Sequence, residues 1–163
     1  MKRLRAMLNG SIKMDAIGVV LDAVAPNLLG KWNSIRCILI PLGYKCLSLP
    51  NANGTILNLE GVSNIGIWMM PDNTVDGMLE DFCARLISEQ AINYASECAQ
   101  NALQRGLATY KSNHSTKAAI HTALAWQDSP GMPLGQAITA RALDAASPIA
   151  EVFANFLRTT FTP

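Results

Sequence analysis

Residues 66–81 read GIWMMPDNTVDGMLED and carry the strongest structural signal in the chain. The stretch opens with an apolar run, which is typical of a strand buried on both faces of a parallel sheet, and the run ends just before Asp72. A polar turn then leads into a predicted helix that opens with Glu80 and Asp81. Open α/β folds place their ligand sites at such strand-to-helix junctions. The stretch therefore predicts an α/β fold and the position of a candidate site.

A second apolar run, at residues 16–21 (AIGVVL), has the same character and also ends in an aspartate, Asp22. A helix is predicted between the two runs, over residues 30–40, and Pro41 ends it. Parallel strands need a crossover connection, which is usually a helix. We therefore expect residues 16–21 and 65–70 to form adjacent parallel strands, each buried on both faces and joined by a right-handed connection.

Two shorter strands are predicted in the first half of the chain, at residues 44–49 and 55–59, on either side of an Asn-Gly turn. The second half is predicted to be helical, with helices at residues 77–87, 91–110 and 115–127, and two more beyond a Pro-Gly linker at residues 128–133. We therefore predict a single α/β domain over residues 1–163. It would have a β-rich half (1–75), a helical half (76–163), and a mainly parallel sheet flanked by helices.

The composition restricts the class of protein. Half of the 163 residues are apolar and 15% are charged, which is typical of a globular chain and excludes a disordered one. The net charge of +1 excludes a strong overall field for nucleic acid. No stretch reaches the roughly 18 apolar residues of a membrane span, and the four cysteines show no Cys-x-x-Cys spacing. We expect a cytoplasmic protein with reduced thiols and no membrane partner.

Acidic residues follow both strong strands and also open the next predicted helix. Because neighbouring parallel strands present their carboxyl ends at one edge of a sheet, we expect Asp22 and Asp72 at one surface depression, with Glu80 or Asp81 nearby. Mg²⁺ is often held by one or two carboxylates with water and phosphate, so these acids are candidate metal ligands. The alternative is structural: Asp72 closes an Asx-turn, and the helix acids complement the helix dipole.

Lys117 and His121 are four residues apart, so they share one face of a predicted helix. A lysine there can balance phosphate charge, and a histidine can move a proton near neutral pH. The sequence favours plainer roles for both. His121 lies among apolar residues, which indicates a single structural hydrogen bond, and Lys117 is interpreted as a solvated charge.

Long strings of the sequence resemble one family. These are LDA at residues 21–23 with KWNSIRCIL at 31–39, GIWMMPDNTVDGMLEDF at 66–82, and STKAAIHTALAWQDSPGMPLGQAITARALD at 115–144. Together they resemble DUF3226, a prokaryotic family of unknown function that is itself distantly similar to Toprim-type metal-binding domains. The resemblance extends from about residue 17 to the end of the chain.

A Toprim-type site, by this resemblance, uses a glutamate after its first strand and an Asp-x-Asp pair after a later strand to hold Mg²⁺. Asp22 matches the first aspartate of the pair, but the second position is Val24. The strand that carries the glutamate is not found, because the chain begins just upstream of the strand of Asp22. The resemblance therefore implies a shortened homologue or a truncated reading frame.

Two functions follow from these observations. The first is a non-catalytic Toprim-like module that binds a partner or a nucleotide, or simply oligomerises, and Val24 together with the near-neutral charge favours it. The alternative is a Mg²⁺-dependent, nuclease-like enzyme of phosphodiester chemistry, acting on nucleic acid. Because a missing first strand leaves a sheet edge uncovered, we expect a homodimer.

Overall fold

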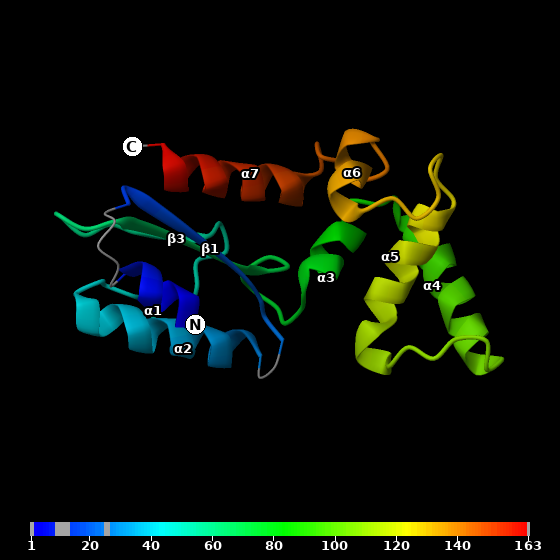
Figure 1. Cartoon of the computed structure of the whole chain (residues 1–163), viewed down its shortest axis with the longest axis horizontal. Helices are drawn as coiled ribbons and strands as arrows, with labels where there is room; N and C mark the ends of the chain where they lie inside the picture. The colour runs from blue at the N-terminus through cyan, green and yellow to red at the C-terminus, as the bar shows by residue number, and fades with distance from the viewer. Residues whose placement is uncertain (1, 9–13, 25–26, 163) are drawn as a thin grey trace. The chain divides into compact units, whose positions relative to one another are not determined.

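The computed structural model describes residues 2–8, 14–24 and 27–162 (Figure 1). The chain divides into two compact units. The first comprises Met1–Met78 together with Val152–Pro163, and the second comprises Leu79–Glu151. The expectation of a single domain over residues 1–163 stays a prediction.

The first unit is a three-stranded sheet between helices. Its elements are α1 (Lys2–Leu8), β1 (Ala16–Asp22), α2 (Leu28–Leu39), the 3₁₀ turn η1 (Ile40–Leu42), β2 (Thr55–Leu57), β3 (Asn64–Met70) and most of α7 (Pro148–Phe161). The strand order is β1-β3-β2. Figure 1 shows α1 and α2 on one side of the sheet and α7 on the other.

The two strong strands are adjacent and parallel, as the sequence predicts. Their register runs from Ala16 opposite Asn64 to Asp22 opposite Met70. β2 pairs with β3 in the antiparallel direction. The sheet is therefore mixed, with one parallel and one antiparallel pair, and a mainly parallel sheet is not confirmed.

Two details of the predicted sheet are wrong. Residues 44–49 form no strand, and Leu47 and Leu49 are exposed. The segment instead contacts α2, where Trp32 Nε1 donates a hydrogen bond to the carbonyl oxygen of Leu47 at 3.2 Å. β1 is not buried on both faces, since every second residue from Gly18 to Asp22 is exposed. Its position at the edge of the sheet explains this difference.

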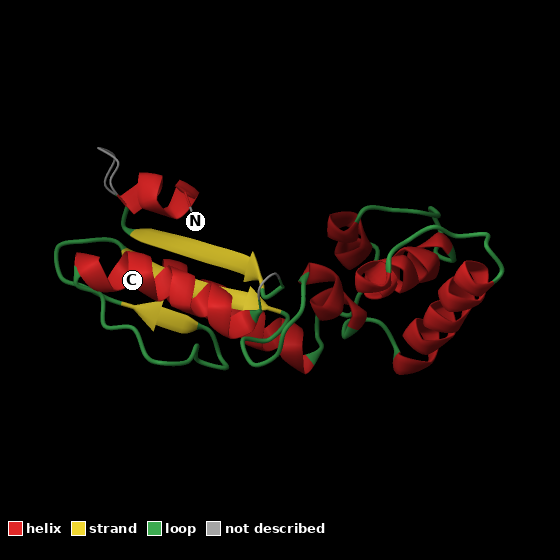
Figure 2. Ribbon diagram, turned by 90° about the horizontal axis from the view of Figure 1, so that it is seen from below, coloured by secondary structure: helices red, strands yellow, loops and turns green. Residues whose placement is uncertain are grey.

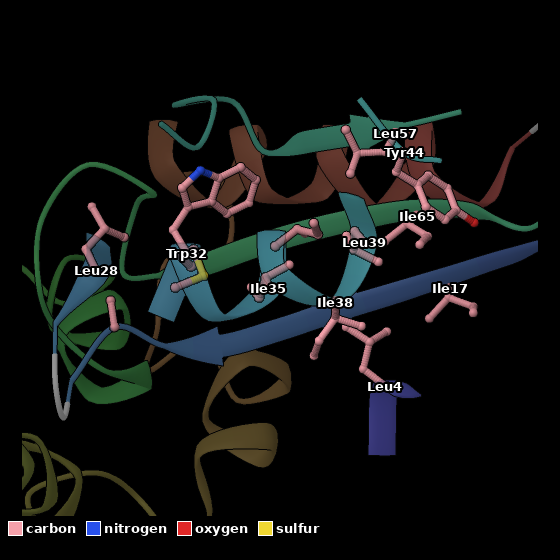
Figure 3. Packing of buried hydrophobic residues seen from close by; sticks show 13 residues of the cluster. Leu4, Ile17, Leu28, Trp32, Ile35, Ile38, Leu39, Tyr44, Leu57 and Ile65 are labelled. Carbon is pink, nitrogen blue, oxygen red and sulfur yellow. The ribbon is translucent and has the colours of Figure 1, made fainter. Parts of the chain in front are cut away.

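The main core lies between the sheet and α2 (Figure 3). Trp32, Ile35 and Leu39 of α2 are fully buried, as are Ile65 and Ile67 of β3. The one-in-three or one-in-four spacing of the helix residues and the alternation of the strand residues place each set on a single face. Burial of each such side chain contributes about 1.5–3 kcal/mol, so this cluster fixes the position of α2 on the sheet.

Glycines let α7 approach the other face closely. A side chain at Gly66 in β3 would collide with Thr160, one at Gly18 in β1 would meet the Phe161 ring, and one at Gly54 would overlap Phe156. Gly66 and Gly18 face each other in the β1–β3 register. The sheet thus offers a flat surface to α7 because it lacks side chains at these points.

An aromatic cluster fixes α7 beside this surface. Trp68 of β3 is fully buried, and its ring lies 5.0 Å from that of Phe153 and 5.4 Å from that of Phe156. Edge-to-face and tilted pairs of this kind contribute about 0.5–1.5 kcal/mol beyond the area that they bury. Trp68 therefore fills the core between β3 and α7.

The second unit is helical. It contains α3 (Leu79–Ala84), α4 (Glu89–Gln104), the 3₁₀ turn η2 (Ser112–His114), α5 (Ser115–Ala125) and α6 (Leu134–Thr139). α4 and α5 pack side by side through small and branched residues, Ala95 and Ala99 on α4 and Ala119, Ile120, Ala123 and Leu124 on α5. Within the described residues, no helix is long and apolar enough to cross a bilayer.

The predicted helix 91–110 ends earlier than expected. The last helical residue is Gln104, and Gly106 adopts a left-handed conformation with φ of 71°. Glycine is the residue best suited to that conformation, and it commonly ends a helix in this way. Residues 105–110 therefore lie outside α4.

Candidate functional site

The first candidate site lies where β1 and β3 end. Asp22 is the last residue of β1 and faces Met70, the last residue of β3, while Asp72 follows two residues later. The parallel pairing thus places Asp22 and Asp72 at the same edge of the sheet, which is the position that the sequence predicts for them. Their role as metal ligands stays a prediction.

Asp72 organises the turn that follows β3. One carboxylate oxygen, Oδ1, accepts hydrogen bonds from the backbone N–H of Thr74 at 2.9 Å, the Thr74 hydroxyl at 2.8 Å and the backbone N–H of Val75 at 3.1 Å. This is the Asx-turn that the sequence leaves open as the structural alternative. At least one oxygen of the predicted metal ligand therefore holds its own loop.

Asn73 fixes the same turn from inside and was missed as a candidate. Its side chain is almost fully buried, and its backbone is left-handed with φ of 66°. Its Oδ1 accepts from Met69 N at 2.7 Å, and its Nδ2 donates to the carbonyl oxygen of Ala52 at 3.2 Å. Asparagine tolerates left-handed backbone, so the Asp-Asn pair after a strand is the local signal for this turn.

Two long-range hydrogen bonds connect the loops after β1 and β3. Ala23 N donates to the carbonyl oxygen of Gly77 at 2.7 Å, and Leu28 N donates to Asp76 Oδ1 at 2.8 Å. Asp76 thereby satisfies an N–H at the start of α2, where a negative charge also complements the helix dipole.

The second candidate site lies in the helical unit, between α3 and α5. Glu80 lies in the first turn of α3 and is largely buried, and its Oε1 lies 3.0 Å from Lys117 Nζ on α5. His121 is one turn beyond Lys117 and is exposed. The Lys117 side chain is 51% exposed, so its charge is partly solvated as well as paired with the Glu80 carboxylate.

The environment of Glu80 favours its ionised form. Burial acts to raise the pKa of the Glu80 carboxyl, but the hydrogen bond from Lys117, a backbone hydrogen bond, and the charges of Lys117 and His121 outweigh it. The net effect is a pKa below the ordinary value for glutamic acid. Glu80 is therefore a stable anion at neutral pH and a poor proton donor.

Cys83 lies one turn after Glu80 and is buried. Burial, and to a smaller extent the negative charge of Glu80, raises the pKa of the Cys83 thiol to about 11. A thiol acts as a nucleophile or as a metal ligand in its thiolate form, which this environment disfavours. Cys83 is therefore a packing residue.

The structure places the predicted ligands in different units. Asp22 and Asp72 belong to the first unit, whereas Glu80 and Asp81 belong to the second. Across the described ranges 2–8, 14–24 and 27–162, no group of three or more Asp, Glu, His or Cys side chains is arranged to hold a metal ion. The arrangement brings together Glu80, Lys117 and His121, a set that the sequence did not connect.

Comparison with known proteins gives one finding. A family model described as Protein of unknown function (DUF3226) matches residues 1–162. No curated protein and no solved structure matches the chain.

Proposed function

We propose that this chain, which belongs to the DUF3226 family of proteins of unknown function, is a non-catalytic, Toprim-like module that binds a partner and oligomerises. One observation carries the proposal. Two of the acids after β3 accept backbone hydrogen bonds: Asp72 from residues 74 and 75 of its own loop, and Asp76 from Leu28 at the start of α2. Catalytic metal ligands must instead direct their oxygens toward the ion.

The second unit supports the same interpretation. Glu80, an acid in the first turn of α3, is paired with Lys117 at 3.0 Å. A metal ion at Glu80 would have to compete with a cation already hydrogen-bonded to the same carboxylate. Val24 adds to this argument, because it occupies the second position of the Asp-x-Asp pair that the Toprim resemblance implies, and an isopropyl side chain supplies no ligand.

The alternative function is Mg²⁺-dependent phosphodiester chemistry. The observation in its favour is that Asp22 and Asp72 follow parallel, paired strands at one edge of the sheet. Two carboxylates are enough to hold Mg²⁺ when water and substrate phosphate complete the coordination. In that case, Asp22 and Asp72 would be the ligands, and Glu80 and Asp81 would not be needed.

A cleavage assay distinguishes the two proposals. The wild-type chain and Asp22→Ala are incubated with single- and double-stranded DNA in the presence of Mg²⁺ or Mn²⁺, and both proteins are also followed by thermal shift across a metal titration. The proposal predicts no cleavage above a protein-free control and no metal-dependent rise in melting temperature in either protein. Robust cleavage by the wild-type chain that Asp22→Ala abolishes would establish the enzyme instead.

A further inference from the structure

The outer edge of β1 is the surface of the first unit that points to a partner. Within the part of the chain that the structure describes, β1 pairs with β3 on one side and with no strand on the other (Figure 2). Proteins usually protect such an edge with lysine, proline or a bulge. β1 contains no lysine and no proline, and its single charged residue is Asp22 at its carboxyl end.

The ladder between β1 and β3 shows which backbone groups point outward. Asn64 N donates to the carbonyl oxygen of Asp15 at 2.9 Å, so the N–H and C=O groups of the odd-numbered residues of β1 are directed toward β3. The even-numbered residues, which include Gly18 and Val20, direct theirs away from the sheet. Their side chains lie on the same face as α7, because Gly18 meets Phe161.

We propose that the outer edge of β1 pairs, in the antiparallel direction, with the same edge of a second copy of this chain. This inference rests on the proposed function as an oligomerising module, and it names the partner and the surface. The two-fold axis passes beside Val19, which places Gly18 opposite the partner's Val20 and Ala16 opposite the partner's Asp22. The outward-facing Gly18 and Val20 then form two hydrogen-bonded pairs with the partner's Val20 and Gly18, roughly four backbone hydrogen bonds in all, and the two sheets become one.

Side chains on the α7 face fit this register. Val20 is 43% exposed and Phe161 is 56% exposed, although both are large and apolar. The Phe161 ring covers Gly18, since a Cβ placed on Gly18 would lie 2.7 Å from Phe161 Cζ. Val20 of each copy would stand opposite the partner's Gly18 and pack against the partner's Phe161. Because the interface is two-fold symmetric, this contact between Val20 and the partner's Phe161 would form twice.

The opposite face and the charges agree with a second copy as the occupant. Leu4 and Met7 of α1 line a pocket of about 380 Å³ along residues 17–21, and Met7 is 43% exposed. A strand added at this edge would cover that apolar surface. Because the register sets each Asp22 opposite an alanine, the two carboxylates lie at opposite ends of the paired segment and do not repel each other.

Sedimentation equilibrium of the full chain between about 1 and 100 µM tests the proposal. The wild type is expected to dimerise in this range, and Val20→Lys is expected to raise the dimer dissociation constant on the order of tenfold or more. The matched control is Leu49→Lys, which changes another exposed apolar residue on the segment leading into β2 and should dimerise like the wild type. A wild type that stays monomeric, or a Val20→Lys variant that dimerises like the control, would overturn the proposal.

Amide hydrogen exchange on the wild type tests the register without any substitution. Raising the protein concentration should slow exchange at Gly18 and Val20 and leave Val19, whose N–H already faces β3, almost unchanged. Dimerisation without added protection at Gly18 and Val20 would exclude this surface. These measurements do not depend on the DNA cleavage assay. A failure of the proposed interface can therefore be distinguished from a failure of the proposed non-catalytic function.

Discussion

Removal of Lys117 should destabilise the helical unit in a pH-dependent way. The Lys117 side chain is 51% exposed, whereas that of Glu80 is only 12% exposed, and the two charged atoms lie 3.0 Å apart. In Lys117→Met the carboxylate stays buried and loses its cation. A hydrogen bond to a charged group is worth about 1.5–3 kcal/mol, and exposure of the lysine reduces this, so we expect a loss of about 1–2 kcal/mol at pH 7.

The pH dependence follows from the sign of the pKa shift. The pKa of Glu80 is lowered in the folded wild type, so the pair stabilises the fold above the unfolded pKa of about 4.5 and that contribution is lost as the pH falls through the lower, folded pKa. Without Lys117, burial is the largest remaining influence and opposes ionisation of Glu80. The difference between the variant and the wild type should therefore shrink as the pH falls from 7 through the lowered, folded pKa of Glu80, below which the carboxyl is protonated in both proteins.

Urea unfolding monitored by circular dichroism, at several pH values, measures this difference. Lys111→Met is the matched control, because Lys111 is exposed on the segment before α5. Glu80→Gln should cost less than Lys117→Met, since it leaves no buried charge. Surface substitutions usually change the free energy of unfolding by less than about 0.5 kcal/mol. The description of this pair is wrong if the free energy of unfolding of Lys117→Met lies that close to that of the control, or if the effect of Lys117→Met does not change with pH.

Three further predictions concern the contacts that hold the elements together. Gly66→Ala should lower the free energy of unfolding in urea by about 2–3 kcal/mol, because the new methyl group collides with Thr160. Adding Thr160→Ala should restore part of that stability, and a Gly66→Ala variant as stable as the wild type would contradict the close approach of α7. Asp76→Ala should lower the free energy of unfolding by about 1 kcal/mol and speed amide exchange in the first turn of α2. Unchanged exchange there would count against the hydrogen bond from Leu28 N to Asp76 as a cap of α2. Cys83 should resist an aromatic disulfide reagent at pH 8 while the exposed Cys37 reacts, and equal rates would refute the raised thiol pKa.

The sequence predicted the parallel pair because its signal is local. The runs at residues 16–21 and 65–70 are apolar throughout and separated by a helical segment, so both the strands and their pairing followed from pattern alone. Residues 44–49 also have a strand-forming composition, yet they pair with no strand in the described structure. An apolar run does not say whether its strand is central or at an edge, which is why the exposure of Val20 was not predicted.

The candidate site was predicted only in part, because much of it depends on contacts between distant residues. The positions of Asp22 and Asp72 follow from strand ends, which the sequence marks clearly. The hydrogen bond from Leu28 N to Asp76 joins residues 48 positions apart, so local capping rules could not find it. Likewise, the pairing of Glu80 with Lys117 depends on how α3 packs on α5, which neither segment encodes alone.

Manganese soaking of a crystal, followed by an anomalous difference map, tests most directly whether the acids form a metal site. Mn²⁺ takes the oxygen ligands that Mg²⁺ takes, and it scatters anomalously, so an occupied site would be located without ambiguity. We predict no manganese peak within coordination distance of Asp22 or Asp72, with Asp72 still bonded to Thr74 and Val75. A manganese ion coordinated by both Asp22 and Asp72 would contradict the non-catalytic interpretation.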